Sequence, residues 1–463
     1  MNLGEQLLEM FESDRIKGIR PSVHAGECLE RLDRIGGRAP SVVVAEPDPA
    51  RFLAAVAAAL AREGRVFLGN PQWAGEEWNE VGRLIKPDIV FGDTPLDLAG
   101  PDEGGMTGVG EPIIGIPTGG SSGKVRFAVH DETSLAAAAN GFCDRFGGGT
   151  LHCLSGLPFF HVSGLMPVVR AAVSGGTASW VSGIENAPAE SQQGTTILSL
   201  VPTRLARWMR DRKKRDFLRG VSAVLVGGAP LSRDLREAAR RERLPLAPSY
   251  GMTETAAAVC VVNPDEFLAG DDSSGKALPH VRLSVKSQQP SAAGRILVAT
   301  PALFRGYVEN GGAEGAFRPE GETRPCGAAR ELRGNRSPWP TEDTGRLDDE
   351  GRLFVTGRLR PLINSGGEKV DPGEVERALI ETGIAAEAHV AGLPDPEWGE
   401  TVVAVYVPGR NSGKTTEELR GRLKSRIAAY KAPKRWIAVD EIPRDSRGKV
   451  DLRSIRTLTR QGD

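Results

Sequence analysis

The sequence predicts an α/β protein in which a large N-terminal domain of parallel-rich βαβ layers precedes a small α+β domain. Its 463 residues are too many for one compact core, because a domain takes on the order of 150 residues. Short apolar runs alternate with helical patterns up to about residue 300, which is typical of parallel βαβ units. Beyond residue 350 the composition changes and a second, shorter α/β pattern begins. We therefore expect domains over 1–358 and 359–463.

In the N-terminal third, two apolar runs predict buried strands at 41–45 and 66–69, and an Ala/Leu-rich helix separates them at 49–62. β-Branched and aromatic residues favour strands, and the turn residues that follow the second run mark its end. A third strand is expected through 127–129, followed by a helix over 131–142. The alternation indicates strands that run in parallel.

The same alternation continues to about residue 300. A buried helix is expected after 157–164, and strands are expected at 196–201 and 221–226. The segment 202–219 predicts one basic amphipathic helix, and 232–241 a charged helix. Few aromatic side chains interleave with the cations of the helix over 202–219, so a solvated helix face is favoured over a nucleic-acid patch.

Residues 309–340 break the pattern, since they are rich in Gly, Arg, Glu and Pro and lack apolar periodicity. We expect an exposed loop there. In the small domain, the segments 371–374 and 415–418 each carry an N-cap residue with Glu three positions later, which predicts two helix starts. Strands are expected near 387–390 and 401–407.

Composition narrows the function. Lys and Arg number 59 against 60 Asp and Glu, so no net field favours nucleic acid or a membrane surface. The longest nearly apolar run, 52–61, is about half of the roughly 20 residues that a spanning helix needs. We expect a soluble, cytoplasmic protein with small-molecule partners, and the sequence leaves a homodimer open. The five cysteines lack Cys-x-x-Cys spacing, so reduced, mostly buried thiols are expected: Cys28, Cys143, Cys153, Cys260 and Cys326.

The segment 117–126 is the strongest candidate for a phosphate-binding loop. Its glycines permit tight backbone turns, while its hydroxyl groups and two cations offer donors to anionic oxygens. A flexible linker is the alternative. The P-loop of kinases and GTPases is excluded, because Thr118 and Val125 stand where that pattern needs Gly and Ser or Thr. The expected phosphate-binding residues are Thr118, Gly119, Gly120, Ser121, Ser122, Gly123 and Lys124.

This loop resembles the nucleotide loop of the acyl-adenylate-forming enzymes, which include acyl-CoA synthetases, peptide-synthetase adenylation domains and luciferases. The usual form is Thr-Ser-Gly-Thr-Thr-Gly-x-Pro-Lys, from which Gly119, Val125 and Arg126 depart. The resemblance implies the adenylate-forming fold, in which the small C-terminal domain is mobile. It also implies ATP, Mg²⁺ and CoA as cofactor and co-substrates.

Two further motifs resemble the family's adenine and metal sites. The segment 249–255 matches its Tyr-Gly-x-Thr-Glu loop, which implies that Tyr250 flanks adenine, Thr253 meets the α-phosphate and Glu254 helps to hold Mg²⁺. A carboxylate suits a hard divalent cation, although Glu254 could instead cap a turn. Other residues that the resemblance places at the nucleotide are Gly251 and Met252 of this loop and Gly228, Ala229 and Pro230 of the turn after a predicted strand.

Four motifs follow in the family's order. The segment 339–345 resembles its Thr-Gly-Asp motif, with Glu342 in place of Gly, so Asp343 is expected to accept both ribose hydroxyls. The segment 357–360 matches the ribose-contacting arginine, Arg358, and the hinge, Arg360.

The Gly-rich loop at 365–370 resembles the one that faces the thiol-transfer state, which involves Gly366 and Gly367. The segment 443–450 resembles the terminal motif whose lysine, here Lys449, bridges the substrate carboxylate and the phosphate during adenylation.

Within the superfamily, the segments 66–71, 157–164, 199–205 and 226–231 look like the o-succinylbenzoate:CoA ligases of menaquinone and phylloquinone synthesis. A substrate with a second carboxylate needs a polar or cationic partner, because a buried unpaired charge costs several kcal/mol. The expected substrate-binding residues are His161, Ser163, Arg204 and Thr255. A ligase for another aryl or medium-chain acid and a non-catalytic nucleotide-binding protein are the alternatives.

Overall fold

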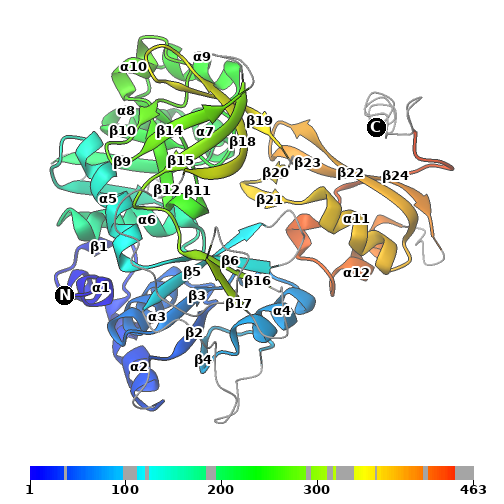
Figure 1. Cartoon of the computed structure of the whole chain (residues 1–463), viewed down its shortest axis with the longest axis horizontal. Coiled ribbons are helices and arrows are strands. Elements are labelled where there is room, and N and C mark those ends of the chain that lie inside the picture. The colour runs from blue at the N-terminus through cyan, green and yellow to red at the C-terminus, as the bar shows by residue number, and fades with distance from the viewer. Residues whose placement is uncertain are drawn as a thin grey trace. The chain divides into compact units, whose positions relative to one another are not determined.

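A computed structural model describes residues 1–35, 39–96, 112–119, 125–183, 194–287, 293–309, 316–319, 338–359, 362–409 and 415–443. The chain divides into two compact units (Figure 1). The larger comprises Met1–Pro71, Leu84–Thr118 and Arg126–Leu359, and the smaller comprises Gln72–Arg83, Gly119–Val125 and Arg360–Asp463. The expected domains over 1–358 and 359–463 stay a prediction.

The first sheet of the larger unit has seven strands in the order β17-β16-β6-β5-β3-β2-β4. Their bounds are β2 Ser41–Val44, β3 Arg65–Leu68, β4 Ile89–Phe91, β5 Ile113–Gly119, β6 Val125–His130, β16 Gly306–Glu309 and β17 Ala316–Pro319. β2 pairs in parallel with β3 and β4, and β3 with β5, whereas β16 pairs antiparallel with β6 and β17. The parallel pairing predicted for the strands around 41–45 and 66–69 is confirmed.

The second sheet has eight strands in the order β1-β8-β7-β9-β10-β11-β12-β13. Their bounds are β1 Ile16–Lys17, β7 Leu151–Ser155, β8 Thr177–Trp180, β9 Thr195–Leu200, β10 Ala223–Val226, β11 Leu246–Met252, β12 Ala257–Val261 and β13 Lys276–Ala277. Pairing is parallel from β1 to β11 and antiparallel at β12 and β13. The carboxyl ends of β10 and β11 therefore meet at one edge.

The helices of the larger unit are α1 Leu3–Glu12, α2 Ser22–Asp33, α3 Pro49–Ala61, α5 Glu132–Arg145, α6 Val162–Val173, α7 Pro202–Met209, α8 Arg212–Gly220, α9 Arg233–Arg241 and α10 Pro264–Leu268. The single helix predicted over 202–219 is wrong, because two helices occupy that stretch. Asp211 separates them, since its side chain accepts a hydrogen bond from the backbone N–H of Lys214 and caps α8. Apolar periodicity alone does not show where a new helix starts within a basic amphipathic run, because that start depends on a local capping residue.

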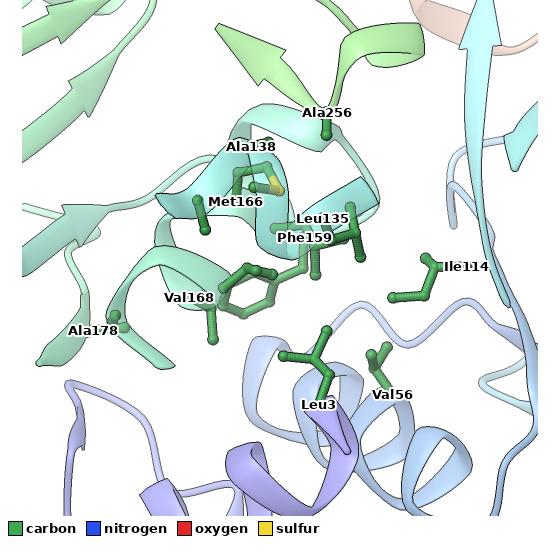
Figure 2. Packing of buried hydrophobic residues seen from close by; sticks show 14 of the residues in the cluster. Leu3, Val56, Ile114, Leu135, Ala138, Phe159, Met166, Val168, Ala178 and Ala256 are labelled. Carbon is green, nitrogen blue, oxygen red and sulfur yellow. The ribbon is translucent and has the colours of Figure 1, made fainter. Parts of the chain in front are cut away.

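The main core of the larger unit gathers α1, α3, α5 and α6 around both sheets. Figure 2 shows Leu3, Val56, Phe159 and Met166 pointing toward one another from separate helices and the loop before α6. The small side chains of α3 allow close helix packing, and every residue from Phe52 to Leu60 is buried. Side chains of β5, β10 and β11, three of the strands that lead to the candidate site, belong to this core.

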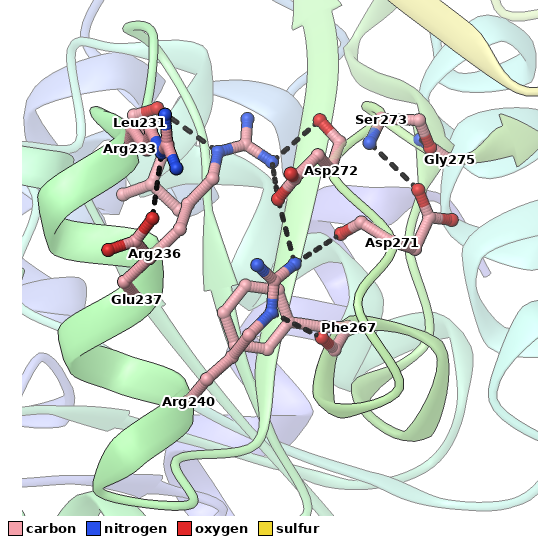
Figure 3. A network of polar contacts seen from close by, with 10 residues as sticks. All are labelled: Leu231, Arg233, Arg236, Glu237, Arg240, Phe267, Asp271, Asp272, Ser273 and Gly275. Atoms are coloured by element: carbon pink, nitrogen blue, oxygen red, sulfur yellow. Dashed lines mark hydrogen bonds and ion pairs between the residues drawn. The ribbon is translucent and has the colours of Figure 1, made fainter.

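Arginines of helix α9 bind the loop that follows α10. Arg236 Nη1 donates to the Asp272 carbonyl at 2.7 Å, and Arg240 Nη2 donates to Asp272 Oδ1 at 2.8 Å (Figure 3). The guanidinium of Arg240 also lies 4.6 Å from the Phe267 ring centroid. These contacts hold the helix that follows β10.

A four-stranded antiparallel sheet completes the larger unit in the order β14-β15-β18-β19. Its strands are β14 Arg282–Lys286, β15 Gly294–Ala299, β18 Trp339–Leu347 and β19 Leu353–Arg358. The exposed loop expected over 309–340 is wrong for its two ends, since β17 pairs with β16 and β18 begins at Trp339. β17 forms an antiparallel pair with its near neighbour β16, whereas β18 pairs with β15, which lies further back in the sequence. The rest of that stretch lies outside the described residues.

The smaller unit contains β20 Ile363–Ser365, β21 Glu368–Val370, β22 Ala385–Asp395, β23 Gly399–Pro408 and β24 Arg435–Ala438, with α11 Pro372–Glu381, α12 Thr416–Leu423 and most of α4 Gly75–Ile85. The two predicted helix starts are confirmed. Asp371 accepts from the Gly373 N–H at the start of α11, and Thr415 accepts from the Glu418 N–H at the start of α12. The two predicted strands correspond to β22 and β23.

Two further expectations concern the described part of the chain. Cys28, Cys143, Cys153 and Cys260 are free and buried, as predicted, and Cys326 lies outside the described residues. Burial raises the pKa of the Cys28 thiol to about 11, so it stays protonated near neutral pH. The helices that the structure describes are all too short or too polar to span a bilayer.

Candidate active site

The strands β5 and β6 deliver the two ends of the predicted phosphate loop. Thr118 near the end of β5 accepts a hydrogen bond at 3.0 Å from Nε of Arg126, which lies at the start of β6. Close packing brings β5 near its neighbours, since a Cβ at Gly115 would lie 2.4 Å from the Phe67 ring. Residues 120–124 lie outside the described residues, so their expected phosphate contacts stay a prediction.

A tight turn after β11 presents Glu254. The turn is a single 3-10 helix, Thr253–Thr255, and it ends at Ala256 in the left-handed region with φ of 49°. Thr255 is fully buried, and its hydroxyl lies 3.1 Å from the Met252 carbonyl and 2.9 Å from the Ala257 carbonyl. The Thr255 hydroxyl is thus committed to holding the turn. Its predicted contact with substrate stays a prediction.

His130 supports the same turn from the end of β6. Its Nε2 lies 2.7 Å from the Thr253 carbonyl oxygen, and its Nδ1 lies 3.1 Å from the Ser134 hydroxyl. Because a carbonyl only accepts, Nε2 carries the proton. Burial lowers the pKa of His130 to about 4, so the ring is neutral at pH 7. The imidazole therefore joins the strand after the phosphate loop to the Glu254 turn.

The Glu254 carboxylate meets two groups at the same oxygen. The Tyr307 hydroxyl donates to Oε1 at 2.6 Å, and Arg126 Nη2 lies 3.9 Å from Oε1. The side chains of Glu254 and Arg126 are 13% and 22% exposed, so their attraction is only partly screened. This arrangement differs from a simple turn cap, because the carboxylate contacts side chains of β6 and β16.

A second cluster joins Tyr250 of β11 to Asp343 of β18. The Tyr250 hydroxyl donates to Asp343 Oδ2 at 2.8 Å, and Arg358 Nε lies 3.4 Å from Oδ1. Burial and the nearby Asp343 carboxylate raise the pKa of the Tyr250 phenol, so it remains a neutral donor. The Asp343 N–H donates to Thr341 Oγ1 at 3.1 Å, which fixes the local turn. The structure thus brings together three of the residues predicted to bind the nucleoside.

Glu342, which replaces the family's glycine, faces Arg295 of β15. Arg295 Nη2 donates to Glu342 Oε1 at 2.9 Å, and its Nε donates to the Thr341 carbonyl at 2.6 Å. The departure is therefore accommodated by an ion pair at the surface, beside the segment that carries Asp343.

The predicted adenine turn follows β10 at the edge where β11 also ends. Gly228 has φ of 82°, which a residue with a Cβ adopts only with strain. Gly228 and Pro230 are exposed, and Ala229 is half-buried. Because β10 and β11 are parallel neighbours, this turn and Tyr250 lie at the same sheet edge, the usual place for ligands in α/β sheets.

His161 and Ser163 lie at the beginning of α6. His161 is the N-cap residue, and its ring centroid lies 4.5 Å from that of Phe160. Both side chains are half-buried. They are close in the chain, so a ligand near the start of α6 could meet both, and their predicted role stays a prediction.

The guanidinium of Arg204, in α7, donates hydrogen bonds to backbone carbonyls. Nη1 donates to Gly156 at 2.9 Å, and Nη2 donates to Val181 and Ser182 at 2.9 and 3.0 Å. Burial lowers the pKa of Arg204 below its ordinary value. The residue therefore joins the segments that follow β7 and β8. Binding a substrate carboxylate would be an additional task for it and stays a prediction.

Gly366 and Gly367 form the turn between β20 and β21 in the smaller unit, with φ of 68° and 97°. The Gly366 N–H donates to the Trp398 carbonyl at 2.8 Å. Lys449 and Arg360 lie outside the described residues. Their roles as bridging lysine and hinge stay predictions.

Sequence reasoning missed Tyr307 and His130. Tyr307 is separated from Glu254 by 53 residues, and its motif context is an ordinary Gly-Tyr pair. His130 carried a weak signal, since it directly precedes Asp131, the N-cap of α5. Their contacts depend on the pairing of β16 with β6 and on the fold of the β11–β12 connection.

Comparison with known proteins places these residues in context. The AMP-binding enzyme family matches residues 109–308, and the AMP-binding enzyme C-terminal domain matches residues 374–449. The 2-succinylbenzoate–CoA ligase of Geobacillus sp. (strain WCH70) is 29% identical over 350 residues, 74% of this chain and 68% of that protein. The indoleacetate–CoA ligase of Aromatoleum aromaticum is 32% identical over 440 residues, 90% of this chain and 79% of that protein.

Among solved structures, a double mutant of o-succinylbenzoate CoA synthetase from Bacillus subtilis has a TM-score of 0.75. It is 23% identical and covers 95% of this chain and 93% of that chain. A likeness at this identity shows the shared fold.

Proposed function

The chain belongs to the AMP-binding enzyme family as an AMP-forming acid–thiol ligase of the adenylate-forming fold, and we propose that its acid is o-succinylbenzoate. In the first step the carboxylate attacks the α-phosphorus of ATP, which forms the acyl-adenylate and releases pyrophosphate. In the second step the CoA thiol attacks the acyl carbonyl and loses its proton, and AMP leaves. The products are o-succinylbenzoyl-CoA, AMP and pyrophosphate.

The observation that carries the choice of acid is the set of segments at 157–164, 199–205 and 226–231, together with relatives named for 2-succinylbenzoate. In the structure these segments lie at or directly after the carboxyl ends of β7, β9 and β10. His161, Ser163 and Arg204 are the groups in them that could meet the second carboxylate. The proposed setting is menaquinone or phylloquinone synthesis in the cytoplasm.

A second candidate is a ligase for another aryl acid. The indoleacetate–CoA ligase is 32% identical over 90% of this chain, whereas the 2-succinylbenzoate–CoA ligase of Geobacillus sp. is 29% identical over 74% of it. Indoleacetate has one carboxylate, so the two candidates differ in whether the site must pair a second charge. That difference can be measured directly.

The nucleotide is proposed to lie beside the Tyr250–Asp343–Arg358 cluster. Asp343 offers two acceptor oxygens for the ribose hydroxyls, and it lies within reach of both Tyr250 and Arg358. Tyr250 and the turn at Gly228 frame the position proposed for adenine. Thr253, held through His130, is proposed to meet the α-phosphate.

Glu254 is proposed to hold Mg²⁺. The donor chemistry fits, because a half-buried carboxylate is a ligand that hard divalent cations prefer. When bound, the cation would offset the phosphate charge that opposes attack. Arg126 and Tyr307 would keep the carboxylate oriented during the reaction.

The test of the acid is a panel assayed for CoA-thioester formation. We expect o-succinylbenzoate to exceed benzoate, indoleacetate and a medium-chain fatty acid by at least about tenfold in kcat/KM, since an unmatched buried charge partner costs more than 1.4 kcal/mol. Equal use of benzoate would exclude o-succinylbenzoate but leave the ligase. Absence of acid-dependent pyrophosphate release with every acid would favour the non-catalytic alternative.

The metal role has its own test. Glu254→Gln keeps the size of the side chain and removes its charge, so the Mg²⁺ concentration for half-maximal pyrophosphate release should rise. Glu237→Gln, on the outer face of α9, is the matched control and should titrate like the parent. An unchanged Mg²⁺ titration in Glu254→Gln would return this residue to a turn-capping role.

A further inference from the structure

We propose that Tyr307 is a positioning residue for Glu254, whose phenol fixes one carboxylate oxygen and thereby presents the other to the Mg²⁺–nucleotide complex. The proposal rests on the proposed metal role of Glu254. It assigns a function in adenylation to a residue of β16 that lies far from the recognised motifs in sequence.

The Glu254 carboxylate is contacted through one of its two oxygens. Among the described residues, the side-chain contacts of Glu254 are the Tyr307 hydroxyl at 2.6 Å and Arg126 Nη2 at 3.9 Å, and both are made to Oε1. A hydrogen bond to an ionised acceptor is shorter and stronger than one between neutral groups. A carboxylate held by Oε1 can bind a cation through Oε2 without turning first.

The Tyr307 ring is itself held on two sides. The Arg126 guanidinium lies 4.1 Å from its centroid, and Phe304 packs edge-on with centroids 4.7 Å apart. Phe304 is in turn packed edge-on against Trp339 at 5.2 Å. These contacts restrict the phenol to one direction, so little side-chain freedom remains to be lost when the site fills.

The backbone ties the strand of Tyr307 to the turn of Glu254. In the register of β16 and β6, Tyr307 is paired with Ala128. Just before β16, the Phe304 N–H donates to the Glu254 carbonyl at 2.8 Å, and the Arg305 N–H donates to Val129 at 2.7 Å. Glu254 is thus held by both its main chain and its side chain through one short segment.

The experiment uses Tyr307→Phe in the full chain, because this change removes one oxygen and keeps the ring between Arg126 and Phe304. Loss of a group that orients a metal ligand typically lowers metal affinity or activity about 10- to 100-fold. We expect the Mg²⁺ concentration for half-maximal pyrophosphate release to rise by that factor. Thioester formation from supplied acyl-adenylate and CoA should stay within about twofold, since it needs no triphosphate–metal complex. Tyr406→Phe, in the smaller unit, is the matched control.

Two further readouts separate positioning from a structural role. Calorimetric binding of ATP at several Mg²⁺ concentrations should show the same displaced Mg²⁺ dependence without turnover. In a cycle with Glu254→Gln, the double variant should resemble Glu254→Gln alone, because Tyr307 acts through that carboxylate.

Either of two results would overturn the proposal even if the metal role of Glu254 holds. One is a parental Mg²⁺ dependence in Tyr307→Phe while Glu254→Gln shifts it, which would leave the metal role of Glu254 intact. The other is an equal fall of both half-reactions with a lower unfolding temperature, which would make Tyr307 structural. If neither variant shifts the Mg²⁺ dependence, the metal role of Glu254 fails first, and the proposal fails with it.

Discussion

Acidification should destabilise the larger unit through His130, because this side chain is fully buried as the neutral form. Its ring lies between the Thr253 carbonyl and the Ser134 hydroxyl, and the charges of Glu254 and Arg305 act on its pKa. Burial lowers its pKa from 6.5 to about 4, while the bond to Thr253 and the Glu254 carboxylate oppose that change. Charging the imidazole in place would cost the desolvation free energy of a cation.

The sign and size of the effect follow from linkage. Between pH 6.5 and 4 the unfolded chain binds the proton and the folded protein does not, so stability rises with pH across that window. The contribution is fully present above pH 6.5 and is lost as the pH falls toward 4. The displaced pKa corresponds to about 3 kcal/mol at most, of which roughly 2 kcal/mol is lost between pH 7 and 4.5.

The assay is urea unfolding at pH 7 and pH 4.5 for the parent and His130→Gln. Glutamine keeps an N–H near the Thr253 carbonyl and does not titrate, so the variant should lose less stability on acidification than the parent, by roughly 2 kcal/mol. His280→Gln is the control for function: burial also lowers the pKa of His280 to about 4, but only His130 contacts the Thr253 turn. Both variants should flatten the pH dependence, and only His130→Gln should raise KM for ATP. An unchanged pH dependence in His130→Gln would refute this account.

Two further predictions concern the separate half-reactions. Lys449→Ala should lower the rate of pyrophosphate formation by about 10²- to 10³-fold, because a cation positioned between two anions stabilises the adenylation transition state. Supplied acyl-adenylate and CoA should still react at nearly the parental rate. An equal loss in both assays, with folding intact, would contradict a step-specific lysine. Gly366→Ala should slow thioester formation more than adenylation, since a Cβ there would lie 2.8 Å from the Trp398 ring. Gly351→Ala is the control for backbone strain, because Gly351 has a similar positive φ and its added Cβ would have no neighbour within 4 Å. Equal slowing of both steps in Gly366→Ala would contradict alternation of the small domain.

Local physics let the sequence predict much of the fold. The cap at Asp371, the Pro at the next position and the Glu that follows are sufficient to place the start of α11, because capping involves neighbours in the chain. Apolar runs likewise identified β2 and β3, whose apolar side chains are buried on both faces. The ordered motifs from 117 to 450 identified the family, which the comparisons confirm.

The same local reasoning failed where strand pairing or helix capping competes with the pattern of the run itself. The stretch at 316–319 has no strand pattern of its own, yet it pairs with β16. The helix expected over 202–219 is interrupted because Asp211 caps a new helix, a choice that competes with continuation of the same amphipathic run.

The sequence by itself thus determined the family and the set of residues predicted for the nucleotide site, since motif order and residue chemistry need no coordinates. Only the tertiary structure decided how those residues are engaged. Tyr250 meets Asp343 across 93 residues and Tyr307 meets Glu254 across 53. Arg204 donates to three backbone carbonyls, although its charge suggests a carboxylate partner. Such contacts depend on strand order, register and the direction of each side chain, which chain periodicity does not encode.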